Sequence, residues 1–237
     1  MSFKVKLGRK IKAFFIKAKL HHLIEPLNDI FLQKLSYLSK LSQWHSKHPR
    51  PEFKRLDGDR YELYRYLLTQ RHLDGEIDYV EFGVAAGHSL KWWVENNKNA
   101  ASRFVGFDTF AGLPEDWGFL KRGTFTTEGR VPDIRDARCS FKVGMFQETL
   151  TAFLAAQSLA RQTVVHLDAD LYSSTLFVLS VLAPKLKPGD ILIFDEFGVP
   201  THEFRAFRDF VAAYQMKYKV VGVVNDYLQV AVELVKE

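Results

Sequence analysis

The chain has 237 residues, of which 47% are hydrophobic and 26% are charged, enough apolar material for one sizeable core plus an extension. This balance excludes a disordered chain and an integral membrane protein. The single cysteine, Cys139, excludes an intrachain disulfide and a zinc site built from several cysteines. Residues 1–55 hold 13 Lys/Arg against 3 acidic residues, a net charge of +10, whereas the remainder carries −5. A basic arm on an acidic body argues against nucleic acid as the partner of the whole chain.

The basic arm, residues 1–55, is predicted to be helical. From Val5 to Leu41, apolar residues mostly recur at three- or four-residue steps with lysines beside them, and Pro26 is expected to divide this segment into two helices. Its apolar runs are too short for a secretory signal or a membrane span, so the expected location is the cytoplasm. The arm could lie on the inner face of an anionic membrane, or pack on the domain or on a second copy of the chain. His45–Pro51 is predicted to be a linker.

The body, residues 56–237, alternates predicted strands and helices. Strands are expected over Ile77–Phe82, Arg103–Asp108, Ser140–Val143, Thr163–Asp168, Asp190–Asp195, Tyr218–Val224 and Tyr227–Leu234. Helices are expected over Tyr61–His72, His88–Asn97, Glu148–Ala160, Ser173–Leu186 and Thr201–Tyr214. This alternation predicts an α/β fold with a doubly wound, mostly parallel, seven-stranded sheet. The short Asn225-Asp226 turn predicts a C-terminal antiparallel hairpin.

The segment Ala111–Ala137 interrupts this alternation. It is rich in Gly, Pro and charged residues and shows no clear periodicity. A loop of this length in a compact domain is usually functional, so we expect a lid. Its aromatic residues, such as Trp117 and Phe125, would close over a ligand or form a small core beneath the loop.

Two strand ends point to a nucleotide-like ligand. The first predicted strand runs into a turn containing Gly83 and Gly87, which permits close backbone approach to a ligand at a helix start. Alanine at position 85 excludes the dinucleotide-binding fingerprint, and a structural turn is an equal alternative. Asp108 ends the second predicted strand, where an acid suits the hydroxyls of a ribose. Its alternative role is a helix N-cap or turn residue, but the two strand ends together favour the ribose.

Four acidic residues follow two later strands. Asp168 and Asp170 close one strand, and Asp195 and Glu196 follow the next. Crowded like charges are costly unless something offsets them, and a hard divalent cation with oxygen ligands, such as magnesium, would do so. The alternative makes Asp170 a helix N-cap and Asp195 a turn residue. The crowding favours the cation.

From Tyr61 to the C-terminus the chain resembles class I S-adenosylmethionine-dependent methyltransferases, and in particular the macrocin O-methyltransferase family. The similarity rests on five strings in order: Glu81-Phe82-Gly83-Val84 with Gly87 and Ser89, Asp108 to Pro114, Gly144 to Thr149, Leu167 to Thr175, and Lys187 to Asp190 before Asp195. Members of this family methylate sugar hydroxyls on natural products and depend on magnesium. The family usually has two aspartates after the fifth strand, whereas this chain has Asp195 and Glu196.

The resemblance implies a role for individual residues. The implied S-adenosylmethionine contacts are Glu81, Gly83, Val84, Gly87, Ser89, Asp108, Thr109, Phe110, Gly144, Phe146, Gln147 and Asp168. Asp168, Asp195 and Glu196 would bind Mg²⁺. Asp170 would be the general base, and His202 is the second candidate for that role.

The implied function is metal-dependent transfer of a methyl group from S-adenosylmethionine to a hydroxyl of a sugar, of a glycosylated small molecule or of a glycan. One alternative keeps the chemistry and changes the acceptor to a catechol-like diol. Another is a non-catalytic scaffold held by its basic arm at a membrane or a biosynthetic complex, and a homo-oligomer is compatible with each. Nucleic-acid methylation is disfavoured, since the chain lacks an Asn/Asp-Pro-Pro-Tyr/Phe string.

Overall fold

The computed structural model describes residues 3–27 and 31–236. Its helices are α1 (Phe3–Lys17), α2 (His21–Leu27), α3 (Gln33–Lys47), α4 (Arg60–Gln70), α5 (His88–Asn96), α6 (Phe146–Ala156), α7 (Tyr172–Leu182) and α8 (Glu203–Tyr214). Its strands are β1 (Phe53–Arg55), β2 (Ile77–Phe82), β3 (Arg103–Asp108), β4 (Cys139–Val143), β5 (Gln162–Leu167), β6 (Ile191–Phe194), β7 (Tyr218–Val224) and β8 (Gln229–Leu234). The five helices and seven strands predicted for the body are confirmed, with ends that shift by a few residues.

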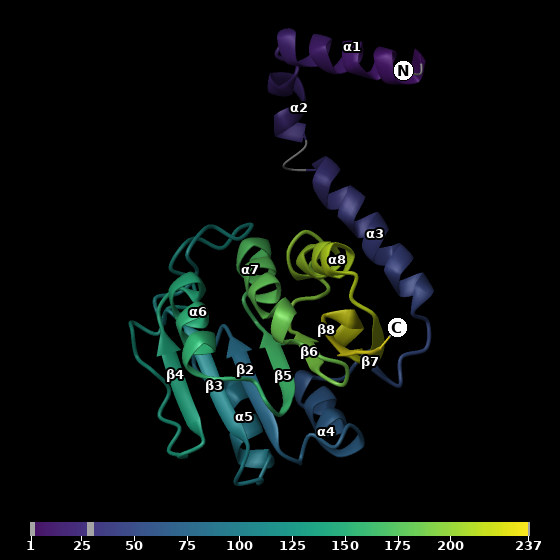
Figure 1. The fold of residues 1–237 in the computed structure, drawn as a ribbon. Helices are drawn as coiled ribbons and strands as arrows, with labels where there is room; N and C mark the ends of the chain where they lie inside the picture. Colours follow the sequence, from purple (N-terminus) through teal and green to yellow (C-terminus); the bar gives the residue numbers. More distant parts are fainter. Residues whose placement is uncertain (1–2, 28–30, 237) are drawn as a thin grey trace.

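The strands form one sheet in the order β1-β7-β8-β6-β5-β2-β3-β4 (Figure 1). Neighbouring strands are parallel except at β8, which runs antiparallel to β6 and β7. The doubly wound, mostly parallel sheet and its antiparallel C-terminal hairpin are therefore confirmed. The sheet has an eighth strand, because β1 pairs with β7 at the edge. Three residues are too few to show a strand pattern in the sequence, and β1 lies within the segment predicted to be a helical extension.

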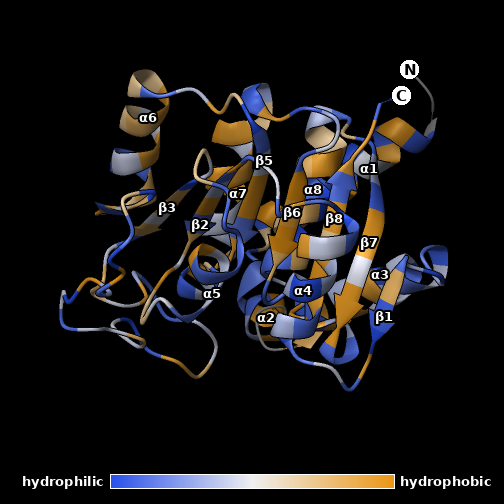
Figure 2. Ribbon diagram, turned by 90° about the horizontal axis from the view of Figure 1, so that it is seen from below, coloured by the Kyte–Doolittle hydropathy of each residue, from blue (hydrophilic) through white to orange (hydrophobic). Residues whose placement is uncertain are grey.

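Helices cover both faces of the sheet. One core lies between the sheet and α6, α7 and α8, and the other between the sheet and α4 and α5. Side chains alternate between these cores along β2, with Tyr79 in one and Val80 in the other. Burial on both faces explains why strands such as β6 are continuously hydrophobic (Figure 2).

The arm contains three described helices, and α1 and α2 extend away from the body (Figure 1). The prediction of two helices was wrong in number, because the chain also turns at residues 18–20, between α1 and α2. Pro26 occupies the last turn of α2, which ends at Leu27, so the expected break at Pro26 agrees with the end of this helix. Residues 28–30, which follow, lie outside the described residues. No helix that the structure describes has the length and apolar character needed to cross a bilayer.

The last helix of the arm is anchored to the body. Trp44 of α3 is buried, and its Nε1 donates a hydrogen bond of 2.8 Å to the hydroxyl of Tyr218. His45 stacks on Tyr227 with ring centroids 4.0 Å apart. The prediction that His45–Pro51 is a linker was therefore wrong for its first residues. These contacts extend α3 to Lys47.

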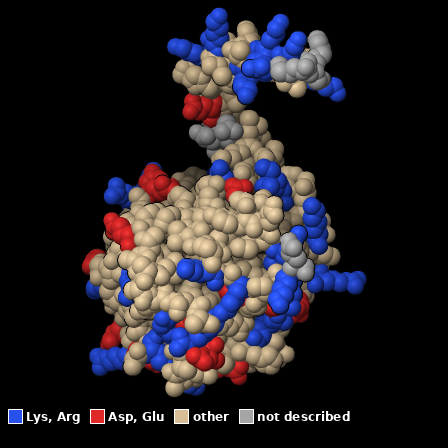
Figure 3. Space-filling model, in the orientation of Figure 1, with Lys and Arg blue, Asp and Glu red and all other residues tan. Residues whose placement is uncertain are grey.

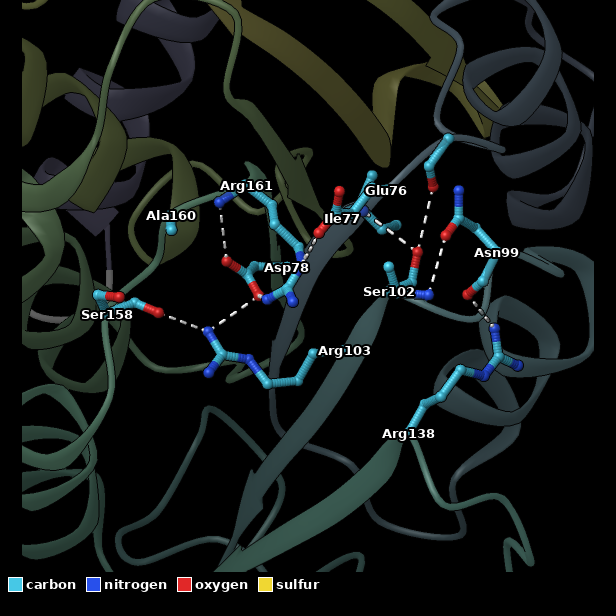
Figure 4. A network of polar contacts seen from close by, with 12 residues as sticks. Glu76, Ile77, Asp78, Asn99, Ser102, Arg103, Arg138, Ser158, Ala160 and Arg161 are labelled. Atoms are coloured by element: carbon cyan, nitrogen blue, oxygen red, sulfur yellow. Dashed lines mark hydrogen bonds and ion pairs between the residues drawn. The ribbon is translucent and has the colours of Figure 1, made fainter.

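A buried carboxylate joins the starts of three strands at the amino-terminal edge of the sheet. Asp78, on β2, is fully buried, and its Oδ1 lies 2.9 Å from Arg103 Nη2 and 3.0 Å from Arg161 Nη1 (Figure 4). Its Oδ2 accepts a hydrogen bond of 3.1 Å from the backbone N–H of Arg161. Two guanidinium groups thus neutralise one acid and fix the register of β2, β3 and β5.

Candidate active site

Strand register assembles the candidate site at the opposite edge of the sheet. The last residues of β2, β5 and β6 are paired across the sheet, so the residues that follow them stand side by side. Backbone hydrogen bonds continue this alignment beyond the strands: Asp168 N–H donates to Phe82 O at 2.9 Å, and Asp195 N–H donates to Leu167 O at 2.9 Å. The central strands therefore deliver Gly83, Asp168 and Asp195 to one place.

Gly83 is required by both its backbone angle and its surroundings. Its φ is +90°, and a Cβ at this position would lie 1.8 Å from the backbone oxygen of Asp168. Gly87, with φ +79°, precedes α5, and a Cβ there would lie 2.7 Å from the ring of Pro132. Only glycine fits these positions, so the turn lets the end of β2 pass directly against the acidic strand end.

Asp108 holds this glycine turn in place. Its Oδ2 accepts hydrogen bonds of 2.7 Å from the N–H groups of Val84 and Ala85, and its Oδ1 accepts one of 2.7 Å from the N–H of Phe110. The turn role weighed for Asp108 is therefore observed. Asp108 also lines the cavity described below.

The four predicted acids line one cavity, and Arg60 lies among them. Its Nη2 is 2.8 Å from Oδ2 of Asp195, and its Nη1 is 3.5 Å from Oδ2 of Asp168. Asp170 has a φ of +57°, a left-handed conformation that is uncommon for residues other than glycine. This turn follows β5 directly and places Asp170 at the cavity wall rather than at a helix N-cap; the N-cap of α7 is Leu171.

Burial and mutual repulsion make these acids weaker than usual. Burial, with the charge of Asp195 in second place, raises the pKa of Asp170 to about 7 and that of Glu196 to about 7. Burial and Asp195 also raise the pKa of Asp168 well above its usual range, and burial raises the pKa of Asp195 itself. Carboxylates in this state readily take up a proton or a cation, which is typical of a functional site.

The donor set fits a divalent cation. One donor atom each from His166, Asp168 and Asp195 lies within 4.8 Å of the others. Oδ1 of Asp195 is buried and, among the described residues, has no hydrogen-bond partner. An orphaned carboxylate oxygen inside an acidic cluster is a ready metal ligand, and Glu196 supplies another carboxylate to the same cavity.

Behind the acids lies a buried polar network that includes Glu81. The hydroxyl of Tyr79 donates to Oε2 of Glu81 at 2.5 Å and lies 2.8 Å from Nδ1 of His166. The hydroxyl of Tyr64 lies 3.2 Å from Nε2 of the same histidine and 3.2 Å from the hydroxyl of Ser89. Glu81 and Ser89 thus support the site from within the core.

The cavity has a volume of about 320 Å³, within the range of small-molecule sites. The predicted residues that line it are Gly83, Asp108, Thr109, Phe146, Gln147, Asp168, Asp170, Asp195 and Glu196. The predicted residues that do not line it are Glu81, Val84, Gly87, Ser89, Phe110, Gly144 and His202. The structure therefore brings the acids and most of the implied cofactor wall together, and places the other residues in the turns and core around them.

The loop Ala111–Ala137 forms one wall of the cavity through Gly112, Leu113, Pro114, Trp117 and Phe125. Phe119 points outward and is fully exposed. His202 contacts the ring of Trp117, with centroids 6.0 Å apart, and burial lowers the pKa of this histidine. His202 therefore adjoins the loop wall, one side chain away from the cavity.

Three residues of the site were missed from the sequence. Arg60 starts α4, and the spacing of Asp59 and Glu62 could have located that helix start but not its place beside the acids. His166 had a signal, because it shares a strand face with Asp168 at a spacing of two. Glu203, at the start of α8, is fully buried and accepts a 2.9 Å hydrogen bond from the N–H of Glu196.

The chain is similar in sequence to known O-methyltransferases. The family model described as macrocin-O-methyltransferase (TylF) matches residues 121–229. An 8-demethyl-8-(2,3-dimethoxy-alpha-L-rhamnosyl)-tetracenomycin-C 4'-O-methyltransferase from Streptomyces olivaceus is 32% identical over 201 residues, which cover 76% of this chain and 72% of that protein.

Solved structures share the fold. The calicheamicin methyltransferase CalS11 superposes with a TM-score of 0.57 at 23% identity, covering 74% of this chain and 80% of its own. The O-methyltransferase NovP gives a TM-score of 0.55 at 19% identity, covering 74% of this chain and 79% of its own. At these identities the likeness concerns the fold alone.

Proposed function

Because the chain belongs to the macrocin O-methyltransferase family of S-adenosylmethionine-dependent enzymes, we propose that its acceptor is a hydroxyl of a sugar, carried by a small molecule or a glycan. The observation that carries the proposal is the group of four carboxylates facing one cavity at the ends of β5 and β6. The relative from Streptomyces olivaceus, named for a rhamnosyl-bearing compound, supports a sugar acceptor.

The cofactor would occupy the part of the cavity between the glycine turn and α6. When bound, S-adenosylmethionine supplies a methyl group already activated on a sulfonium. Gly83 would offer bare backbone to the methionine end, Asp108 and Thr109 would meet the ribose, and Phe146 and Gln147 would border the adenine; their shared place in the cavity lining supports these roles. Because Asp108 already fixes the turn, the cofactor wall is formed before binding.

We propose that Asp168, Asp195 and Glu196 hold Mg²⁺, with His166 behind them. A bound divalent cation would offset the clustered charge and lower the pKa of an acceptor hydroxyl. The buried, orphaned Oδ1 of Asp195 supports this assignment. Glutamate at 196 keeps a carboxylate at the cavity wall where the family usually has aspartate.

Asp170 is the proposed general base. It lies at the cavity wall, and without metal burial raises its pKa to about 7. A cation bound beside it would lower that pKa, so the carboxylate would be ionised and able to accept the hydroxyl proton near neutral pH. The loop wall, with Trp117 and Phe125, would limit water around the acceptor. His202 remains a second candidate, since its lowered pKa leaves it neutral at pH 7, but it stands behind Trp117.

The acceptor is tested by methyl transfer. The full chain is incubated with isotopically labelled S-adenosylmethionine and a panel of rhamnosylated compounds, nucleotide sugars, glycans and catechols, and the products are mapped by mass spectrometry. Methylation of a sugar hydroxyl supports the proposal. Methyl transfer to catechols alone would contradict the sugar acceptor and identify the acceptor class as aromatic diols.

We further propose that the chain divides near residue 55 into an arm and a catalytic body, and that α1 and α2 of the arm contact the inner face of an anionic membrane from the cytoplasm. Helix α1 carries six Lys/Arg and no acidic residue, and it exposes Ile11, Phe14 and Ile16 by more than 60% each. Figure 3 shows these basic side chains gathered at the end remote from the body. Apolar and cationic groups together are typical of interfacial helices.

Vesicle co-sedimentation tests the arm. The full chain should sediment with vesicles containing phosphatidylserine, and less so with neutral vesicles or with Lys6 and Lys10 changed to Glu. The membrane role is contradicted if the chain sediments with neither vesicle type. If it instead forms dimers that Phe14→Glu abolishes, the arm is an interface between two copies of the chain.

A further inference from the structure

Arg60 places a guanidinium between two of the carboxylates proposed to bind metal. Its Nη2 is 2.8 Å from Asp195 and its Nη1 3.5 Å from Asp168. The side chain of Asp195 is 2% exposed, so it meets Arg60 in a setting that screens charge weakly. The ends of β5 and β6 therefore already share a cation in this structure.

The two cations compete for the same pair of carboxylates. A divalent cation needs carboxylate oxygens at about 2.0–2.6 Å, whereas the guanidinium holds Oδ2 of both acids and places a repelling positive charge beside any ion bound there or at Oδ1 of Asp195. We propose that Arg60 is a resident counter-cation: it neutralises Asp168 and Asp195 in the metal-free enzyme and yields them when a divalent cation binds. This inference rests on the metal site of the proposed function.

The position of Arg60 allows such an exchange. Its side chain is 35% exposed and lines the cavity, so the guanidinium can swing toward the open side. The start of α4 is held separately, because the side chain of Asp59 accepts a 3.0 Å hydrogen bond from the N–H of Glu62. Releasing Arg60 therefore costs its ion pairs but leaves the helix cap intact.

Arg60 could also have the opposite effect on metal binding. If Arg60 held the carboxylates in the geometry that metal needs, its removal would weaken metal binding. If it competes, its removal strengthens metal binding and destabilises the metal-free protein, because buried carboxylates lose their counter-ion. The two roles predict changes of opposite sign.

The test compares Arg60→Gln with Arg65→Gln, an exposed residue of the same helix. Mn²⁺ is titrated into the chelator-stripped full chain by calorimetry, and the melting temperature is measured with EDTA and with Mn²⁺. We expect Arg60→Gln to bind Mn²⁺ about tenfold tighter or more than wild type, since it removes one adjacent charge. It should also melt lower in EDTA and gain more from Mn²⁺, while Arg65→Gln matches wild type.

Equal or weaker Mn²⁺ binding by Arg60→Gln, with wild type still binding, would overturn the counter-cation role and leave the metal site standing. Absence of binding by both would overturn the metal site itself. If Arg60→Gln fails to fold in EDTA, Arg60→Lys provides the same readout. Lysine lacks the fork that reaches two carboxylates, so Arg60→Lys should bind Mn²⁺ more tightly than wild type, and binding no tighter than wild type contradicts the proposal.

Discussion

The two edges of the sheet treat buried acids differently. At the amino-terminal edge, Asp78 is paired with two arginines and one backbone N–H (Figure 4). At the carboxyl-terminal edge, within residues 3–27 and 31–236, the ion pairs of four clustered carboxylates run to Arg60, apart from a 4.0 Å approach of His166 Nε2 to Oδ1 of Asp195. The first arrangement compensates its charge and holds strands together. The second leaves negative charge to spare, which a ligand, a metal or a proton must meet, and that surplus marks the functional edge.

The largest effect should come from Asp170→Asn. An amide of the same shape cannot take the acceptor proton, so the turnover number should fall by about 10²–10⁴-fold. Calorimetry should show S-adenosylmethionine binding within a few-fold of wild type, because Asp170 belongs to the acceptor side. Full turnover by this variant would move the base elsewhere, and His202→Gln would then be the variant to assay.

The free energy of unfolding should depend more on the acid at the amino-terminal edge than on those at the carboxyl-terminal edge, whereas activity depends on the latter. Asp78→Ala removes the buried carboxylate that joins Arg103 and Arg161 and should lower the free energy of unfolding by about 1–3 kcal/mol, because both guanidinium groups are partly exposed and keep other partners. Asp195→Asn, measured in EDTA, relieves repulsion within the cluster and should cost far less. Urea denaturation of both variants provides the comparison. Equal losses would mean that the carboxyl-terminal edge is as well compensated as the other.

Stability without metal should depend on pH in one direction. The folded-state pKa of Asp170 and of Glu196 lies near 7, above the values of an unfolded chain, so the folded protein holds these protons more tightly. Their contribution to stability is therefore full below pH 4 and is lost as pH rises through 7. Solvent screening should limit the loss to about 1 kcal/mol. Urea denaturation in EDTA from pH 5 to pH 8 checks this, and Asp170→Asn should flatten the slope.

A smaller effect is expected at the loop wall. Trp117→Ala removes an aromatic surface from the cavity and should raise the KM for the acceptor by about 2- to 10-fold. Phe119→Ala, on the same loop but fully exposed, is the matched control and should leave KM unchanged. Steady-state kinetics with saturating cofactor separates the two. Similar changes in both variants would indicate that the loop acts as a whole rather than through Trp117.

Much of this account could be predicted from the sequence, because it depends on local patterns. Strand and helix alternation identified the sheet, and carboxylates directly after the strands identified the acidic edge. Arg60 could not be found this way, because its place beside Asp195 depends on how α4 packs on the sheet. For the same reason the sequence did not show that Glu81 and Ser89 turn into a buried network, or that Asp108 fixes the glycine turn.

The arm shows the same limit. Its helical periodicity was visible, but the continuation of α3 to Lys47 depends on Trp44 meeting Tyr218 from the other end of the chain. The edge strand β1 depends likewise on β7. Short elements held by distant partners carry little signal of their own.

If the uncompensated acids bind a divalent cation that methyl transfer needs, activity must depend on that cation. The test is the turnover of the EDTA-stripped enzyme, before and after Mg²⁺ is restored. The substrate is a compound of the panel that the untreated enzyme methylates. Stripping should abolish turnover, and Mg²⁺ should restore it. Undiminished turnover in EDTA would contradict this dependence and leave the surplus charge to protons and Arg60 alone.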